Sequence, residues 1–188
     1  SMGDYNSVQL ADRMDHPKLI GDIVSSWKKI ANNRKTIVFA SSVAHSKNLA
    51  ESFIDIGVKA AHIDGSTDHA ERERVLKEFN NGDMKIICNC MVLTEGFDCP
   101  PAEVCVLARP TKSLGMYIQM VGRVLRPYEG KEHATIIDHS GAVYMHGFVE
   151  DDIEWVLDPK KPMTIKERKL AKPKEEAQII CEGCFSMF

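Results

Sequence analysis

The sequence predicts a three-layer α/β domain built on a mostly parallel sheet. Short, continuously apolar runs alternate along the chain with segments whose apolar residues recur at helical spacing. Runs without polar alternation are typical of strands covered on both faces. The chain has 188 residues and is 44% hydrophobic, enough to bury one core. Strands and helices in alternation give a sheet with helices on both faces.

The first half of the chain is expected to hold three helices and three strands. Pro17 suits a first helical position, and the helix after it carries an apolar stripe as far as Ile30. Gly57 should end a second helix, while Asp68 and Gly82 should begin and end a third. The strands are expected at Thr36–Ala40, Lys59–Ile63 and Met84–Cys88.

The second half adds two strands and one helix. The strands are expected at Val104–Ala108 and Ala134–Asp138, with a helix between them that Ser113 caps and that runs to Pro127. The domain is expected to cover residues 16–157. Residues 1–15 form an N-terminal extension that opens on a cloning remnant, and residues 158–188 form a basic linker. Ligands of such domains gather at loops beyond the carboxyl ends of the strands, so we expect the functional residues there.

The bulk properties exclude several classes of protein. No run of about 18 apolar residues predicts a membrane span, and no secretory leader opens the chain. The net charge of -3 argues against a surface covered in positive potential, so any nucleic-acid contact must be local. Six cysteines without an export signal indicate reduced thiols, with Cys88 and Cys105 as buried apolar residues.

The strongest local pattern lies near the end of the helix that Ser113 should cap. Gln119, Gly122, Arg123 and Arg126 are spaced to share one helix face. Gly122 costs a helix about 1 kcal/mol relative to alanine, which suits a place where a ligand approaches the backbone. Two guanidiniums beside a glycine can bind a polyphosphate through planar forks of donors. Taken alone, such a pair is more often a solvated helix face.

Four segments, in order, resemble motifs of superfamily 2 helicases. Residues 36–42 resemble motif IV, residues 64–66 the short glycine motif, residues 93–100 motif V, and residues 119–126 motif VI. The combination is most similar to the C-terminal RecA-like lobe in the bacterial and phage branch related to restriction-enzyme translocases and repair helicases. DEAD-box RNA helicases usually carry a His-Arg pair where this chain has Gln119 and Met120.

This resemblance implies roles for individual residues. Arg126 matches the arginine finger and Arg123 its companion at the γ-phosphate. The other residues carried over are nucleotide-binding Gln119, Gly96 and Asp98, and nucleic-acid-binding Ser41, Gly65, Ser66 and Thr94. Cys90 stands where relatives often have a strand-contacting threonine, and a thiol is a weak donor, so no contact is assigned to it. Structural alternatives remain open: Asp98 as a turn residue, and Ser41 or Ser42 as a helix cap.

Half of an ATPase site is missing from this sequence. It has neither a phosphate-binding Gly-x-x-x-x-Gly-Lys-Ser/Thr loop nor an acidic magnesium box. The resemblance therefore implies an N-terminal RecA-like lobe that precedes this one and holds Mg²⁺ with ATP. We expect this fragment, taken alone, to have no ATPase activity. The partner would be DNA rather than RNA. The protein would be cytoplasmic and encoded by a bacterium or a phage. A non-catalytic nucleic-acid-binding module and the motor of a restriction enzyme are the alternatives.

The C-terminal stretch changes in composition after residue 158. Lysines and arginines crowd a segment interrupted by three prolines, which is typical of a solvated linker; a phosphate-contacting strap is the alternative. Cys181 and Cys184 have the spacing of half a zinc knuckle. Two thiolates cannot close a tetrahedral site, so Zn²⁺ would need ligands from a longer protein. Two incidental thiols are the alternative.

Overall fold

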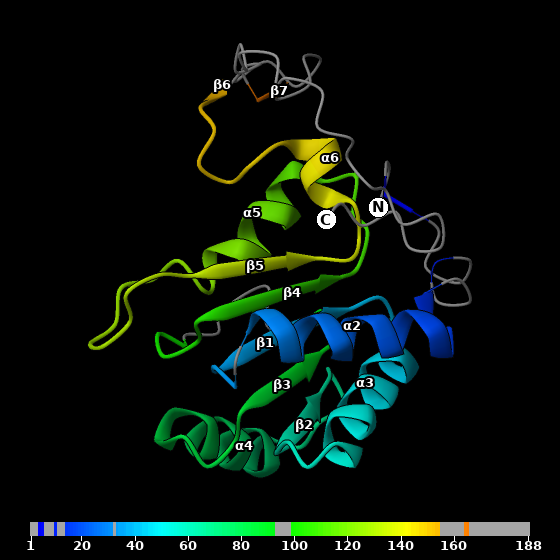
Figure 1. The fold of residues 1–188 in the computed structure, drawn as a ribbon, viewed down its shortest axis with the longest axis vertical. Helices are drawn as coiled ribbons and strands as arrows, with labels where there is room; N and C mark the ends of the chain where they lie inside the picture. The colour runs from blue at the N-terminus through cyan, green and yellow to red at the C-terminus, as the bar shows by residue number, and fades with distance from the viewer. Residues whose placement is uncertain are drawn as a thin grey trace.

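The computed structural model describes residues 4–5, 10, 14–31, 33–92, 99–154 and 164–165. Its centre is a five-stranded sheet with strand order β2-β3-β1-β4-β5, in which every pairing is parallel (Figure 1). The strands are β1 (Thr36–Ala40), β2 (Ala60–Ile63), β3 (Ile86–Asn89), β4 (Val104–Ala108) and β5 (Thr135–Asp138). The predicted three-layer α/β fold is confirmed.

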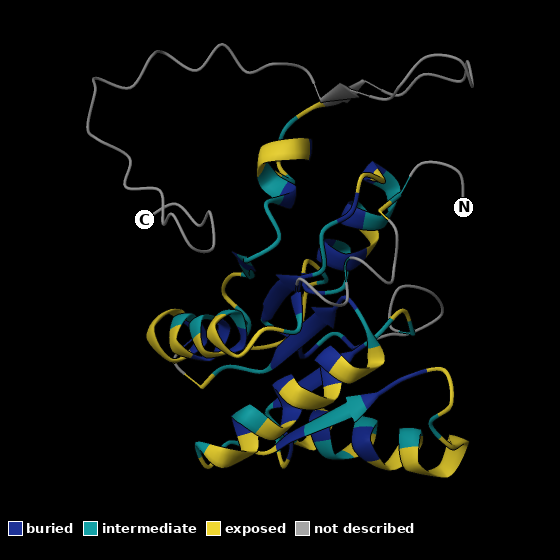
Figure 2. Ribbon diagram, turned by 90° about the vertical axis from the view of Figure 1, so that its right-hand side faces the viewer, coloured by how far each residue is buried: buried dark blue, intermediate teal, exposed yellow. Residues whose placement is uncertain are grey.

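Helices cover both faces of this sheet. They are α2 (Pro17–Ile30), α3 (Val43–Asp55), α4 (His69–Asn81), α5 (Leu114–Gly122) and the short α6 (Ala142–His146). One core joins α2 and α3 to the sheet, and the other joins α4 and α5 to its opposite face. Successive residues of β1 alternate between the two cores, with Ile37 and Phe39 in one and Val38 and Ala40 in the other. Figure 2 shows the buried sheet between helices that are exposed on their outer faces.

Local signals in the sequence account for most helix ends. His16, Ser42, Asp68 and Ser113 each cap a helix by accepting a hydrogen bond from a backbone N–H of the first turn. Gly82 follows α4 with φ 90°, the left-handed conformation that favours glycine. Cys88 and Cys105 are buried in the strands, as expected, and burial raises the pKa of both thiols.

The expected end of α5 is wrong. The helix stops at Gly122 rather than continuing to Pro127. Beyond it, the N–H of Val124 bonds to the carbonyl of Val121 at 3.0 Å, a tighter i to i−3 turn. Val124 remains fully buried while Leu125 is 48% exposed. The chain therefore turns away from the helix axis before it reaches Arg126.

The remaining described residues continue beyond β5. Ile153–Glu154 (β6) pairs antiparallel with Thr164–Ile165 (β7), which lies inside the stretch expected to be a linker. The domain limits at residues 16 and 157 stay a prediction. Across the described ranges, none of the helices combines the length and the apolar character that a membrane crossing requires.

Candidate nucleotide and nucleic-acid sites

The loops that follow the strands gather at the side of the sheet where the parallel strands end, here called the carboxyl edge; the side where the strands begin is the amino edge. Because all five strands are parallel, Ser41, Gly65 and Ser66 lie at this edge, after β1 and β2. Gly65 and Ser66 are exposed, whereas Ser41 is 5% exposed. The structure thus places the three described nucleic-acid candidates at one edge; Thr94 lies outside the described residues.

Ser41 is held by a buried histidine of α3. His45 Nδ1 lies 2.9 Å from Ser41 Oγ and accepts the Ser41 N–H at 3.4 Å. Nδ1 is thus the acceptor, and the Ser41 hydroxyl donates its one proton to it. Burial lowers the pKa of His45 to about 4, against a smaller opposing effect of Asp15, so the ring is neutral near pH 7. Ser42 caps α3 through His45 N–H, as one of the open alternatives supposed.

A second histidine organises the loop after β2. His62 Nε2 donates to Asp64 Oδ2 at 3.0 Å, and its Nδ1 lies 2.7 Å from Ser46 Oγ. Asp64 Oδ1 accepts from both the N–H and the hydroxyl of Ser66, at 2.8 Å and 2.6 Å. Hydrogen bonds from Ser66 and His62 hold the pKa of Asp64 well below its usual range in spite of burial. The loop is rigid because α3, β2 and the Ser66 turn share one network.

Among the cationic residues at the same edge is Arg109, which no sequence motif indicated. Arg109 follows β4 directly, and its strand neighbour Ala108 pairs with Ala40 of β1. The Arg109 guanidinium donates to Met91 Sδ, in the loop after β3. Because β1 lies between β3 and β4, this side chain crosses the end of β1 beside Ser41. Arg109 belongs to no spaced motif; its only signal was its position directly after a buried strand.

The arginines of the strongest sequence pattern lie at the opposite edge. α5 starts after the carboxyl end of β4 and runs back across the sheet, so the carbonyl of Met120 lies 3.8 Å from Cys105 Sγ near the start of β4. Gln119 is exposed, and Arg123 and Arg126 are partly buried. These three candidates do not lie beyond the carboxyl ends of the strands, where we expected the functional residues, because the helix carries them back to the amino edge.

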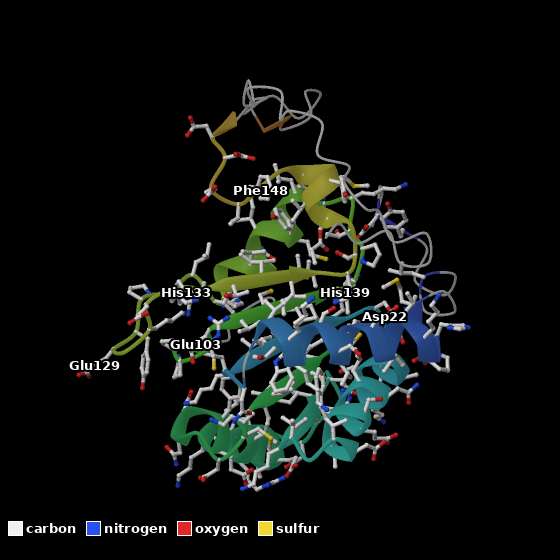
Figure 3. The ribbon with its side chains drawn as sticks, viewed as in Figure 1. Asp22, Glu103, Glu129, His133, His139 and Phe148 are labelled. Carbon is white, nitrogen blue, oxygen red and sulfur yellow. The ribbon has the colours of Figure 1, made fainter. Side chains whose placement is uncertain are left out.

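The turn after α5 is fastened to the segment that precedes β4. Lys131 Nζ donates to the carbonyl of Arg126 at 2.9 Å and to that of Pro100 at 3.4 Å. Partial burial lowers the pKa of Lys131. Figure 3 shows Glu129 at the tip of the loop between α5 and β5. Gly96 and Asp98 fall outside the described residues.

Gly122 is not required by the packing of the described residues. A Cβ built on it meets nothing within 4 Å, and its φ is not in the left-handed region. The fold therefore tolerates a side chain here, and the open space lies in front of the helix end that carries Arg123. Gly65 has the same property at the carboxyl edge.

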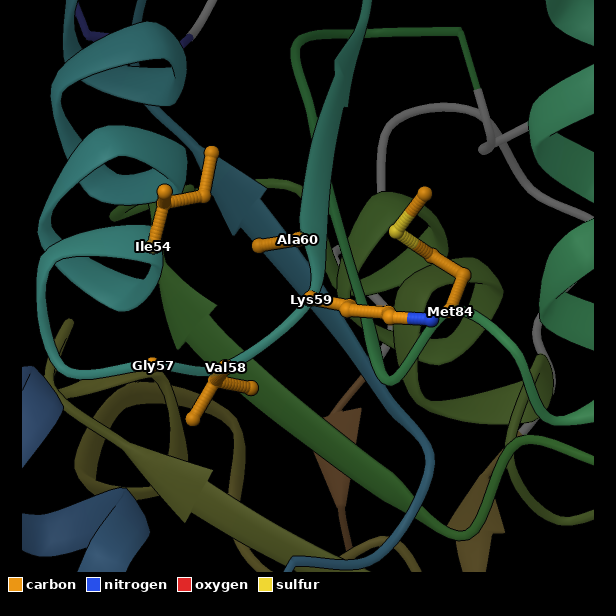
Figure 4. A pocket seen from close by; sticks show the side chains of 6 residues that line it. All are labelled: Ile54, Gly57, Val58, Lys59, Ala60 and Met84. Carbon is orange, nitrogen blue, oxygen red and sulfur yellow. The ribbon is translucent and has the colours of Figure 1, made fainter.

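Other parts of the chain offer weaker candidates. A shallow cavity of about 370 Å³ opens at the start of β2, where the end of α3 meets Met84 (Figure 4). Its lining is apolar apart from Lys59, so it lacks the donors that phosphate requires. In the described ranges, no group of three His, Cys, Asp or Glu side chains could hold a metal. Cys181 and Cys184 lie outside those ranges, and their zinc site stays a prediction.

Comparisons with known proteins agree with the fold. The family described as helicase conserved C-terminal domain matches residues 15–128. A 51.5 kDa protein of a Lactococcus phage is 37% identical over 153 residues, 81% of this chain and 33% of its own length. The Saccharomyces cerevisiae protein named "Putative ATP-dependent helicase IRC3" is 31% identical over 163 residues, 81% of this chain and 24% of its own. This chain thus spans a quarter to a third of these relatives.

Solved structures show the same fold. A fragment titled as a putative HsdR subunit of a type I restriction enzyme from Vibrio vulnificus superposes with a TM-score of 0.60 at 23% identity, covering 72% of this chain and 28% of that one. Domain 2 of the DEAD-box helicase Mss116p, bound to an RNA duplex, gives a TM-score of 0.52 at 20% identity, covering 69% and 50%. The chain has the RecA-like fold of superfamily 2 C-terminal lobes and belongs to the helicase conserved C-terminal domain family.

Proposed function

We propose that this chain is the second motor lobe of an ATP-dependent DNA helicase or translocase. In this role, Arg126 is the arginine finger and Arg123 its companion at the γ-phosphate. The lobe also contacts the tracked strand through its carboxyl edge. The preceding lobe supplies the phosphate loop and the Mg²⁺ ligands, so ATP is hydrolysed only where both lobes meet.

The observation that carries this proposal is that one sheet separates two sets of candidate residues. The arginines follow the end of α5 at the amino edge, and the Ser41 and Gly65 loops lie at the carboxyl edge. A motor must couple a change at the nucleotide to a change at the tracked nucleic-acid strand, and a closely packed sheet can transmit such a change as a unit. A single binding surface would not need residues at both edges.

The amino edge is suited to nucleotide phosphates. Gln119 is exposed, and the space in front of Gly122 is open. A guanidinium placed there stabilises the charge that develops on a transferring phosphoryl group, and positioning and electrostatics supply most of the catalysis of phosphoryl transfer. Both arginines are present, which favours a motor over a non-catalytic module of the same fold.

DNA is proposed as the tracked polymer because the sequence motifs resemble DNA translocases and repair helicases. The likeness to an RNA-bound DEAD-box domain concerns the fold alone. Both polymers share the phosphodiester backbone that the carboxyl edge would contact, so hydrolysis stimulated by DNA and by RNA must be compared directly.

The test is ATP hydrolysis by this chain alone and by a longer protein that includes the preceding lobe. We expect no significant turnover from the chain alone, and DNA-stimulated turnover from the longer protein, because the phosphate cradle and the arginines must act on one nucleotide. Robust, DNA-stimulated hydrolysis by the chain alone would contradict the proposal.

A further inference from the structure

Two of the described candidates at the carboxyl edge, Ser41 and Ser66, already donate their hydrogen bonds within the chain. Phosphate oxygens need N–H or O–H donors. The hydroxyl proton of Ser41 is given to His45, and both the N–H and the hydroxyl of Ser66 are given to Asp64. These residues shape the edge, but they must exchange existing hydrogen bonds before they can bind a phosphate. A cationic side chain at this edge would supply donors and a charge that these serines do not offer.

Arg109 supplies a permanent charge in the middle of this edge. Its guanidinium lies across the end of β1, between the loops after β3 and β4. Its Nε is buried and has no hydrogen-bond partner within the part of the chain that the structure describes. A sulfur atom is a weak acceptor, so the bond to Met91 leaves most of the donor capacity of the guanidinium unused.

The turn that follows Arg109 already binds an oxyanion of the chain itself. The carboxylate of Asp4 accepts the N–H of Lys112 at 2.9 Å and the hydroxyl of Thr111 at 3.2 Å. Burial works to raise the pKa of Asp4, but the hydrogen bonds from Lys112, Tyr5 and Thr111 and the charge of Arg109 lower it overall. Thr111 is 1% exposed, so its hydroxyl is fixed toward this position.

We propose that Arg109, the Thr111 hydroxyl and the Lys112 N–H form a binding site for a backbone phosphate of the tracked strand, and that the Asp4 carboxylate occupies the Thr111 and Lys112 donors in this structure. This inference rests on the proposed function and adds to it a cationic contact and a competing acidic residue. A phosphodiester presents the same pair of acceptor oxygens as a carboxylate, with a full negative charge for the guanidinium. The bound strand therefore displaces Asp4.

The first experiment measures binding of a fluorescent oligo-dT to the 188-residue chain over a series of salt concentrations. Arg109→Ala should weaken binding roughly tenfold or more at low salt, the value of one charge-assisted contact. It should also reduce the slope of log K against log salt by about 0.7, the contribution of one phosphate contact in a single strand. Arg109→Lys should keep the slope because it keeps the charge.

The matched control is Arg74→Ala. Arg74 is an exposed arginine of α4 that pairs with Glu71 and Glu78, so this variant changes the net charge equally at a place away from the site. Asp4→Asn should tighten binding, and that gain should disappear in the Arg109→Ala background because both residues act on one phosphate. Thermal melts verify that each variant is folded.

The outcomes separate this inference from the proposed function. A reduced slope of log K against log salt in Arg109→Ala, but not in Arg74→Ala, supports the site. An unchanged slope of log K against log salt in Arg109→Ala overturns it. If Ser66→Ala still weakens oligo-dT binding in that case, the proposed function stands. No strand binding by the wild-type chain or by the longer protein would contradict the proposed function itself. Inorganic phosphate that binds Asp4→Asn without competing with oligo-dT would show an anion site unrelated to the strand, and would also overturn the inference.

Discussion

Two histidines fix the side chains that shape the carboxyl edge. His45 accepts from Ser41, and His62 connects Ser46 to Asp64 across α3 and β2. His45 contacts the strand-binding candidate Ser41 directly, and His62 reaches the candidate Ser66 through Asp64. The histidines therefore act as positioning residues, and the first consequence is a pH dependence of folding.

The first prediction concerns His45→Asn. The folded-state pKa of His45 is about 4, and an unfolded histidine titrates near 6.5, so between these values the unfolded chain binds more protons. The free energy of unfolding must therefore fall as the pH falls through this window. From pH 7 to pH 5, the wild type should lose about 2 kcal/mol more than His45→Asn, which keeps an acceptor but cannot titrate.

Urea unfolding at the two pH values measures this difference. His69→Asn is the matched control, because it makes the same substitution at a side chain that is 83% exposed. The interpretation is wrong if His45→Asn and the wild type lose the same stability between pH 7 and pH 5.

The residue scale is also where sequence reasoning was weakest. The motif at residues 64–66 indicated the loop after β2, but His62 and Ser46 meet there only because α3 packs against β2. Contacts between side chains of separate elements have no fixed spacing in the chain, so no periodic pattern predicts them. Arg109 was overlooked for the same reason: its partner Met91 belongs to another loop.

At the scale of elements, continuous apolar runs predicted the strands well. β1 and β4 have the expected bounds, and the other three strands differ by one or two residues at their ends. α5 shows the limit of this approach. The spacing from Gln119 to Arg126 fits a helix face, yet the helix ends at Gly122. The spacing of residues shows where a helix is possible. The turn after Gly122 instead depends on the burial of Val124 in the core.

The second prediction at this scale is that Gly122→Ala separates stability from activity. Its Cβ meets no atom within 4 Å and the residue is helical, so alanine should stabilise the chain by about 0.4–1 kcal/mol, mainly by restricting the unfolded state. In the full-length enzyme, the same methyl group would occupy the space proposed for the nucleotide, and hydrolysis should decrease.

Gly115→Ala provides the comparison within the same helix. Its Cβ would make an ordinary contact of 3.8 Å with Ser113 Oγ, so it should be tolerated in the fold without affecting hydrolysis. If Gly122→Ala destabilised the chain in urea unfolding, the space at the end of α5 would not be open to a side chain. If it left hydrolysis at the level of Gly115→Ala, that space would have no role in nucleotide binding.

For the whole molecule, the central feature is that the two sets of candidate residues lie at opposite edges of the sheet. The sequence predicted the fold and the family, because four motifs in order are specific. It did not predict that α5 would carry the arginines to the edge opposite the Ser41 and Gly65 loops. That arrangement depends on the direction of one helix relative to the strands, and it makes the two proposed sites separable by mutation.

Single-turnover ATP hydrolysis by a longer protein that includes the preceding lobe, with nucleotide and nucleic-acid affinities measured beside it, tests this claim most directly. In Arg126→Ala, hydrolysis should fall by roughly 10³–10⁵ while ATP and strand affinities stay largely intact, because the guanidinium stabilises the transition state more than bound ATP. Lysine should restore little, since it lacks the planar fork. Arg74→Ala should behave as the wild type. Near-normal hydrolysis in Arg126→Ala would mean that the arginines after α5 are a solvated surface, and would contradict the account.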